Sequence, residues 1–559
     1  MEYYSSDTNS PSQGKDGTRI IMGHNSYDDP DSSNSRSSTD SKKNISTEKH
    51  VIDLEEKFQG DTIYQLSSRN SFHDESSYSP KPGKIERFFK SLNAETNGIE
   101  PIPDEQKTDN SLLNAASMWF SANLVLASYS LGVLGTAVYG LNFGQSAMVI
   151  IFFNIIGLLP VAFFSVFGAQ LSMRQMILSR FLIGNVTARI FSIFNTIACG
   201  GWVVVNTIAA AQLLNMVNIG SGHNAPLWAG CLIVIGGTLL VSFFGYGFIH
   251  TYEKYSWIPN FAIFLVIIAR LKMSGQYEEG PWTGGRTTAG NVLSFGSTVF
   301  GFAAGWTTYA ADYTVYMPKS TNKCKIFFAL VAGLSFPLFF TQLIGAAAGT
   351  GVIKNAQWAK LYDKNGTGGL TYGIIVQDSL HGFGQFCCVL LAMSTVAINI
   401  PGIYTLSMSV PAIWSKLNKV PRIFWTFASN AVILGIAIPA CYYFTSFMQN
   451  FMDSISYFLA IYIAMSLSEH FIYRKGKFEN YNIEDWNNPK NLPIGYAGVS
   501  GLIVGAFGVA IGMVQTYWRG EIGRLIGKDG GDIGFELGLS WSFIAYNLIR
   551  PLELKYFGR

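Results

Sequence analysis

The sequence predicts an all-α polytopic membrane protein with about twelve transmembrane helices. Hydrophobic residues make up 49% of the 559 positions and charged residues only 13%, whereas a soluble domain uses about 25% charged residues. From Leu112 onward, apolar stretches follow one another almost without pause. Each is close to the roughly 20 residues that cross a bilayer, so the chain is expected to fold within lipid.

The predicted transmembrane domain covers residues 111–549. Its spans are apolar stretches separated by short polar or glycine-containing loops. They are expected at residues 113–140, 147–168, 188–216, 227–249, 257–273, 292–316, 326–347, 383–408, 423–444, 452–472, 494–517 and 533–548.

The loops alternate in basic residues, which predicts the orientation of the chain. Loops after even-numbered spans carry Lys and Arg, for example Arg174 and Arg180 after the second span. Loops after the first, third and ninth spans carry none, and those after the fifth, seventh and eleventh mix basic and acidic residues. Because Lys and Arg accumulate on the cytoplasmic side, both termini are expected in the cytoplasm, with residues 550–559 as a short C-terminal tail.

The N-terminal region differs in composition from the rest of the chain. Residues 1–110 are rich in Ser, Asp, Asn, Lys and Glu, as in DSSNSRSSTDSKKN. Such a segment buries too little apolar surface to offset the entropy of ordering. It is expected to be a disordered cytoplasmic tail.

Two features bear on covalent chemistry. The sequon that begins at Asn365 falls in a predicted external loop and is a possible glycosylation site, although sequons also arise by chance. The six cysteines show no CxxC spacing, so neither structural disulfides nor a metal site is expected.

Two tryptophans lie well inside predicted spans. Trp202 and Asn206 are one helical turn apart in the third span and therefore share a face. Trp306 lies in the sixth span among glycines and other small residues, and Asp312 follows it. Ionisable and polar groups at membrane depth usually mark a pathway, and Asp312 is the candidate for proton coupling, with a structural salt bridge as the alternative.

The first and eighth spans also carry polar residues. Ser128 lies in the first span, and Ser394, Thr395 and Asn399 precede Pro401 in the eighth. Proline inside a helix kinks or breaks it, so the eighth span is expected to be interrupted there. For Ser394 and Thr395, close helix packing is an equally good explanation.

Together these clusters predict a binding site for a planar ligand. Two indole rings can stack on a heteroaromatic ring, and an amide such as Asn206 can both donate to and accept from its polar edge. Glycine-interrupted spans in corresponding positions of two halves indicate a midplane site. The first and sixth spans form such a pair, which predicts a five-plus-five inverted repeat followed by two C-terminal helices.

Long stretches of the chain resemble a known family. NAASMWFSANLV, MRQMILSR, FGFAAGWTTYAADYTVYMPKSTNK and RPLELKYFGR are similar to fungal purine-cytosine permeases of the nucleobase:cation symporter family. The resemblance extends from about Phe89 to the C-terminus. It implies the LeuT-like inverted-repeat fold.

The resemblance also implies roles for individual residues. Trp202 and Trp306 correspond to residues that stack on the base, and Asn206 to one that hydrogen-bonds it. Asn399 matches part of an asparagine pair, and Ser128 a serine that contacts substrate. Ser394 and Thr395 resemble hydroxyls that help bind sodium in bacterial relatives, whereas fungal members couple to protons.

The eighth span departs from the family pattern. Family members typically read Asn-Asn-Ile-Pro-Asn, whereas this chain has Ile398 and Gly402 in place of the first and last asparagine. Loss of a hydrogen-bond partner for a buried ligand group costs about 1–3 kcal/mol. A changed affinity or base preference is therefore expected.

The resemblance implies a secondary active transporter that imports cytosine and purines (adenine, hypoxanthine, guanine) with a proton across the plasma membrane. The coupling ion would be the proton, and no other cofactor is expected. Two alternatives are a transporter of a pyridoxine-like vitamin and a nutrient sensor that does not transport. An enzyme is disfavoured, because the spans contain no nucleophile–base pair and no metal-ligand cluster.

Partners are expected to be the nucleobase and membrane lipid, and not nucleic acid. Transporters of this type are commonly ubiquitinated and endocytosed, which implies that ubiquitin-ligase machinery acts on the tail at Lys15, Lys42 and Lys43. An inert spacer is the alternative.

Overall fold

The computed structural model describes residues 98–243, 246–414, 416–417 and 420–559. Across these residues the chain is helical, and the one extended pairing is an isolated bridge between Val514 and Arg519. The predicted all-α fold class is confirmed. The α-helices are α3 (Leu112–Asn123), α4 (Leu126–Ala137), α5 (Phe143–Leu171), α6 (Gln175–Leu182), α7 (Asn185–Met216), α8 (Leu227–Phe243), α9 (Tyr246–Ser274), α10 (Arg286–Ala304), α11 (Lys323–Lys354), α12 (Ala356–Ile375), α13 (His381–Met393), α14 (Thr395–Ile413), α15 (Arg422–Ala440), α16 (Phe444–Ser468), α17 (Tyr496–Gly512) and α18 (Gly534–Phe557).

Each of the twelve predicted spans coincides with a helix or a pair of helices. Among the described residues, six helical segments are long and apolar enough to cross a membrane. The number becomes seven if α3 and α4 form one bent span. A multi-spanning membrane protein is therefore established, and the exact number of twelve stays a prediction.

The first and sixth spans are broken, as the inverted repeat requires. α3 and α4 meet at an angle of 52°, and Val125 between them is extended, with φ −138° and ψ 168°. α10 ends at Ala304, and a 3-10 helix from Thr307 to Tyr313 continues the chain after Gly305 and Trp306. Irregular backbone at membrane depth is tolerated where it is buried in protein or lines a cavity.

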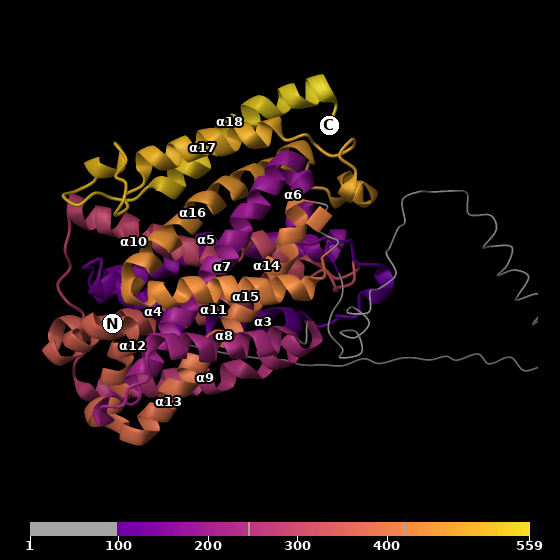
Figure 1. The fold of residues 1–559 in the computed structure, drawn as a ribbon. Coiled ribbons are helices and arrows are strands. Elements are labelled where there is room, and N and C mark those ends of the chain that lie inside the picture. The colour runs from indigo at the N-terminus through magenta and orange to yellow at the C-terminus, as the bar shows by residue number, and fades with distance from the viewer. Residues whose placement is uncertain (1–97, 244–245, 415, 418–419) are drawn as a thin grey trace, which may run out of the picture. The chain divides into compact units, whose positions relative to one another are not determined.

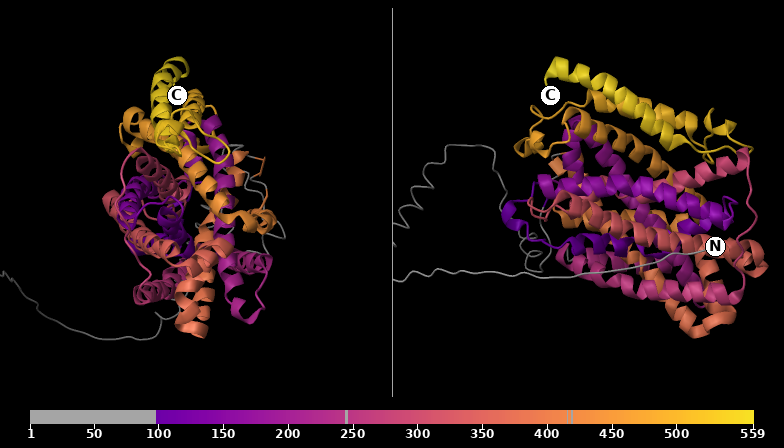
Figure 2. Two further views of the ribbon diagram at one scale, coloured as in Figure 1. Left: turned by 90° about the vertical axis from the view of Figure 1, so that its left-hand side faces the viewer. Right: turned by 180° about the vertical axis from the view of Figure 1, so that it is seen from behind.

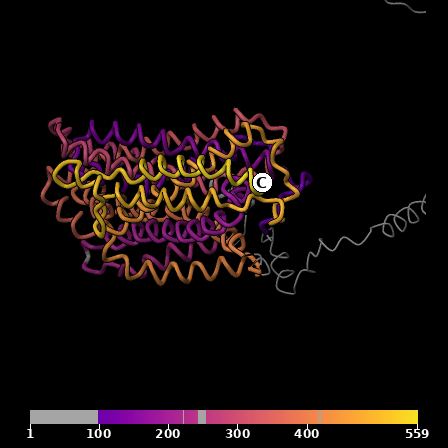
Figure 3. The backbone as a smooth tube through the Cα atoms, turned by 90° about the horizontal axis from the view of Figure 1, so that it is seen from above, coloured from indigo at the N-terminus to yellow at the C-terminus, as the bar shows by residue number. Residues whose placement is uncertain are grey.

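The long helices run side by side (Figures 1 and 3). α7 packs against α14, α8 and α12, while α10 lies against α5 and α16. α17 and α18 pack together along one flank, next to α16 (Figure 2). α6 lies at the end of the bundle that holds the C-terminus, and α12 lies at the other end (Figure 1). The break residues thus lie between packed helices.

The structure describes residues at both edges of the predicted transmembrane domain. Ile99 and Ile102, before the first helix, are buried, and Ile102 donates to the Ser172 carbonyl at 2.9 Å. At the C-terminus, α18 continues to Phe557. Arg550 is buried there, 2.9 Å from Glu469, so an ion pair holds the start of the predicted C-terminal tail. Residues 1–97, including Lys15, Lys42 and Lys43, lie outside the described residues.

The loop after the seventh span is largely helical and contains Asn365. The α12 helix is kinked at Asn365 and Gly366, where Gly366 has φ +52°, a conformation that favours glycine. Asn365 is only 6% exposed, and its side-chain nitrogen donates to Asn215 Oδ1 at 2.6 Å. A glycan on this nitrogen does not fit the folded conformation, contrary to the expectation from the sequon.

Candidate substrate site

The break after α10 lies directly against the Trp202 ring. A Cβ on Gly305 would lie 2.7 Å from Cζ2 of Trp202, so the Trp202 ring packs directly on the residue before Trp306. Phe302 and Phe451 contact the Trp202 ring edge to face, with centroids 5.1 and 5.6 Å away. Trp202 thus lies on α7 with its ring against the break that carries Trp306.

Trp306 is fixed by the other broken span. Its indole nitrogen donates to Oδ1 of Asn123 at 3.1 Å, and Trp119 contacts its ring edge to face at 5.0 Å. Asn123 is the last residue of α3, so the end of one broken helix orients the indole of the other. Trp119 was not singled out from the sequence, although its spacing of four from the polar Asn123 would place both on one face.

Asn206 and Asn399 form a direct pair. The Asn206 amide nitrogen donates to Oδ1 of Asn399 at 3.0 Å, and the Asn399 nitrogen lies 3.4 Å from the hydroxyls of Thr207 and Thr238. Asn399 is thus engaged through both ends of its amide. It holds Asn206 in one orientation and leaves the Asn206 oxygen facing no protein partner.

Several buried polar atoms around the breaks have no hydrogen-bond partner among the described residues. Buried polar groups are normally paired, so a group of orphans indicates where a ligand would bind. The atoms are Ser128 Oγ, Trp202 Nε1, Asn206 Oδ1 and Thr307 Oγ1. Thr307 was not predicted from the sequence, although it directly follows Trp306.

The site is closed to solvent in this conformation. Trp202 is 7% exposed and Trp306 5% exposed, while Ser128, Asn206 and Asn399 are fully buried. A ligand would therefore be enclosed by α4, α7, α14 and the residues after α10. An enclosed state is one of those that alternating access requires.

Ser394 and Thr395, whose hydroxyls resemble those of a sodium site in bacterial relatives, lie beside the first break. Ser394 Oγ accepts from the Leu126 N–H at 3.4 Å and donates to the Leu391 carbonyl, whereas Thr395 Oγ1 donates to the Ala392 carbonyl at 2.8 Å. The helix interruption falls at Ser394, between α13 and α14, and Pro401 lies inside α14. This corrects the expected position of the break. The described residues contain no group of three His, Cys, Asp or Glu side chains that could hold a metal.

Asp312 anchors α6. It is six residues beyond Trp306, in the 3-10 helix that begins at Thr307. Its Oδ1 accepts from the Gln175 N–H at 2.7 Å, and its Oδ2 accepts from Thr405 at 3.3 Å. Arg174, the residue before α6, adds positive charge nearby. These contacts are those of a carboxylate that caps a helix.

The two departures in the eighth span lie next to the asparagine pair. Ile398 is buried beside Asn399. A Cβ on Gly402 would lie 3.2 Å from Cγ2 of Val203 and 3.6 Å from the Cys199 carbonyl oxygen. Gly402 lies on α14, about one helical turn beyond Asn399. It therefore faces α7, the helix that carries Trp202.

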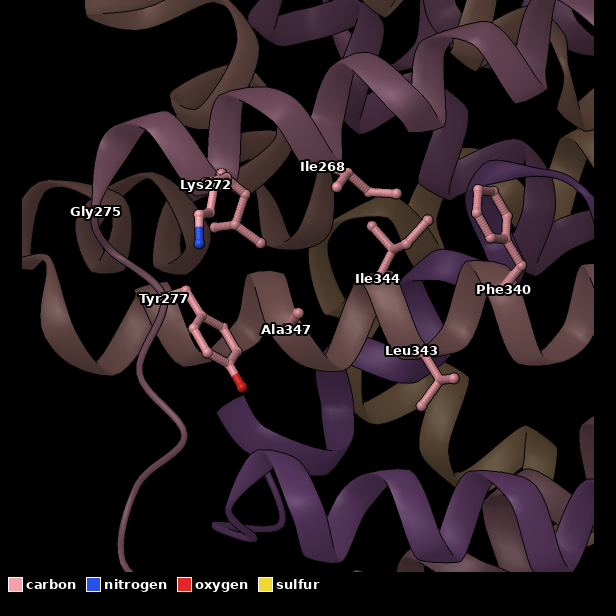
Figure 4. Close-up of a pocket in the computed structure, with 9 residues that line it drawn as sticks. Ile268, Lys272, Gly275, Tyr277, Phe340, Leu343, Ile344 and Ala347 are labelled. Carbon is pink, nitrogen blue, oxygen red and sulfur yellow. The ribbon is translucent and has the colours of Figure 1, made fainter. Parts of the chain in front are cut away.

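A cavity of about 550 Å³ lies elsewhere, between α9 and α11 (Figure 4). Apart from Lys272 and Tyr277, its lining is apolar. It contains none of the predicted site residues and offers few partners for a polar ring edge. The helix breaks, and not this cavity, carry the chemistry expected of the substrate site.

Two helices broken in corresponding positions, with buried polar groups at the breaks, are typical of membrane transporters of the inverted-repeat class. The chain belongs to the family described as permease for cytosine/purines, uracil, thiamine, allantoin, whose model matches residues 101–520. It is a transporter and not an enzyme.

Individual relatives show how far the likeness extends. The chain is 68% identical over 485 residues to the purine-cytosine permease FCY2 of Saccharomyces cerevisiae, covering 87% of this chain and 91% of that protein. It is 27% identical over 570 residues to the vitamin B6 transporter TPN1 of the same organism, covering 91% and 97%.

A solved structure confirms the fold. Mhp1, a nucleobase-cation-symport-1 family transporter in a closed conformation with bromovinylhydantoin bound, superposes with a TM-score of 0.61. The match covers 83% of this chain and 96% of that chain at 13% sequence identity.

Proposed function

We propose that this protein is a secondary active transporter that imports cytosine and purines (adenine, hypoxanthine, guanine) with a proton across the plasma membrane. The observation that carries the proposal is the buried site at the helix breaks, where the Trp202 ring packs against Gly305, the residue before Trp306, and the Asn206 oxygen has no hydrogen-bond partner among the described residues. The relative that is 68% identical and named a purine-cytosine permease supports it.

The site chemistry matches a nucleobase. Stacking of one base on an aromatic side chain contributes about 1–3 kcal/mol, and two indoles are available here. The Asn206 oxygen would accept from an exocyclic or ring N–H, while the Trp202 N–H would donate to a carbonyl or ring nitrogen. The hydroxyls of Ser128 and Thr307 can do either. A flat ring that carries both donors and acceptors on its edge satisfies these groups.

Uptake of labelled cytosine by cells that lack their own nucleobase transport tests the proposal. Cells expressing the chain should accumulate cytosine, and unlabelled adenine, hypoxanthine and guanine should compete. Trp306→Ala should abolish uptake. Trp228→Ala is the matched control, because it removes an indole that is 50% exposed on α8 and should leave uptake unchanged.

The same experiment separates the two alternatives. Competition by pyridoxine but not by purines would indicate the vitamin carrier. The 27% identity to the vitamin B6 transporter supports this alternative less than the 68% identity to the purine-cytosine permease supports the proposal. Surface expression without uptake of any compound would indicate a sensor. Either result would overturn the proposed function.

A further inference from the structure

Two aspartates are buried together between α16, α18 and the segment before α18. Asp453 belongs to α16, and Asp532 lies two residues before α18. Both are buried, and the side-chain nitrogen of Gln515 lies 2.9 Å from Asp453 Oδ2 and 3.0 Å from Asp532 Oδ2. One amide nitrogen therefore joins the two carboxyl groups.

The two carboxyl groups are not equally stabilised as anions. Asp532 accepts backbone N–H groups from Val514 at 2.8 Å and Gly534 at 2.9 Å, and it also accepts the Tyr457 hydroxyl. Asp453 accepts the Thr298 hydroxyl at 2.8 Å and otherwise only the shared amide. Hydrogen bonds to a carboxylate favour its charged form, so Asp532 is the better anion.

No positive charge compensates the pair within the part of the chain that the structure describes. Neither aspartate forms an ion pair with Lys, Arg or His. The titratable groups that face the pair are Tyr139, Tyr457 and Glu536, and none of them is cationic. Burial raises the pKa of the Asp532 carboxyl above its ordinary value. Two adjacent buried carboxyl groups without a cation do not both ionise.

The pair is connected to the helix that ends at the substrate site. Thr298, which donates to Asp453, lies on α10, and Tyr139 beyond α4 shares a 2.8 Å hydrogen bond with the same threonine. A Cβ on Gly301 would collide with the carbonyl oxygen of Met452, next to Asp453. α10 and α16 are thus in direct contact at the pair, and Trp306 lies just beyond the end of α10.

We propose that Asp453 and Asp532 share one proton in the closed conformation, and that Asp453 is the carboxyl group whose protonation couples transport to the proton. The proposal rests on the proposed transport function and names its proton-binding group. In the coupling step a hydronium ion gives its proton to an Asp453 carboxylate oxygen, one O–H bond forms, and water leaves. The neutral Asp453 carboxyl group then lies against α10, and Asp532 is the only member of the pair that carries a charge. Removal of the second buried charge favours the closed conformation.

This assignment differs from the one expected from the sequence, which named Asp312. Asp312 accepts two hydrogen bonds that anchor α6 to the 3-10 helix and α14, and Arg174 supplies a nearby cation. The Asp453 pair has no such cation. The two assignments predict opposite outcomes when each aspartate is replaced by asparagine.

Asp453→Asn tests the proposal in cells and in the purified, full-length protein. The variant should still exchange labelled for unlabelled cytosine across the membrane, because exchange moves no net proton. It should lose concentrative uptake and the dependence of uptake on external pH. Asp312→Asn should keep the pH dependence of whatever uptake remains. Asp363→Asn, an exposed carboxyl group on α12, is the control that should match the unmodified protein.

Concentrative uptake by Asp453→Asn with unchanged pH dependence would overturn the proposal. Absence of cytosine exchange in the unmodified protein would instead contradict the proposed function itself. If Asp453→Asn fails to fold, infrared spectroscopy of the unmodified protein and of the more conservative variant Asp453→Glu still decides. A protonated carboxyl C=O band that shifts on Asp453→Glu is expected at neutral pH, and no protonated carboxyl band would contradict the shared proton.

Discussion

At the residue scale, the site is built by pairs of side chains that fix each other. Asn399 uses both ends of its amide to hold Asn206, and Asn123 holds the Trp306 indole. The groups that remain without partners, such as the Asn206 oxygen, are those left for the ligand. Asn399 therefore acts by positioning Asn206 in this conformation.

Asn399→Ala should weaken cytosine binding about tenfold or more, because it leaves the Asn206 amide nitrogen without its acceptor and free to rotate. The Kd for cytosine, measured by equilibrium binding to purified protein, checks this. Thr238→Val is the control, since it removes the 3.4 Å hydrogen bond from the Asn399 nitrogen and the 2.9 Å bond to the Val234 carbonyl but leaves the Asn206–Asn399 bond in place. Equal affinities of Asn399→Ala and the unmodified protein would show that Asn206 needs no such support.

The sequence predicted which residue types gather at the site but not how they pair. Trp202 and Asn206 share a face because they are one turn apart, which is a local property of a helix. The bond from Trp306 to Asn123 joins residues 183 positions apart, and no local pattern encodes that contact. For the same reason the burial of Asn365 against Asn215 on α7 contradicted an expectation drawn from three neighbouring residues.

At the element scale, the breaks determine where the ligand can lie. The end of α10 brings Gly305 against the Trp202 ring, and a side chain at this position would push the ring away. The absence of a Cβ therefore matters for the distance between α7 and the broken span. Close approach of backbone to a ring is a setting in which glycine is required.

Gly305→Ala should raise the Kd for cytosine about tenfold, because overpacking at a tight contact costs roughly 1–3 kcal/mol. Gly236→Ala on α8 is the matched control, since no atom lies within 4 Å of its added Cβ. Binding of cytosine to both variants checks the prediction. Equal binding by Gly305→Ala and Gly236→Ala would mean that the Trp202 position does not contribute to the site.

Spans were easier to predict than their ends. Apolar length locates a helix in lipid, and a helix occurs at every predicted span. The ends of the tails are harder to predict, because Ile102 and Arg550 are held by contacts with distant residues. The helix α12 was missed because its polar composition resembles a loop, although its packing on α7 orders it.

At the scale of the whole molecule, the substrate site lies between two buried networks. Asp453, Asp532 and Gln515 connect α10, α16 and the start of α18, while Asp312 connects the 3-10 helix to α6 and α14. The Asp453 network contacts Thr298 on α10, before Trp306, and the other network contains Asp312, after Trp306. A change of protonation at the Asp453 pair is therefore placed to affect the same broken span that carries Trp306.

Transport by the purified protein in liposomes tests the central claim most directly. With a more acidic medium outside than inside, labelled cytosine should accumulate above its external concentration, and a proton ionophore should abolish the accumulation. Unlabelled cytosine added without a gradient should alkalinise the outer medium. Cytosine that merely equilibrates, with or without the gradient, would contradict proton-coupled import by this chain.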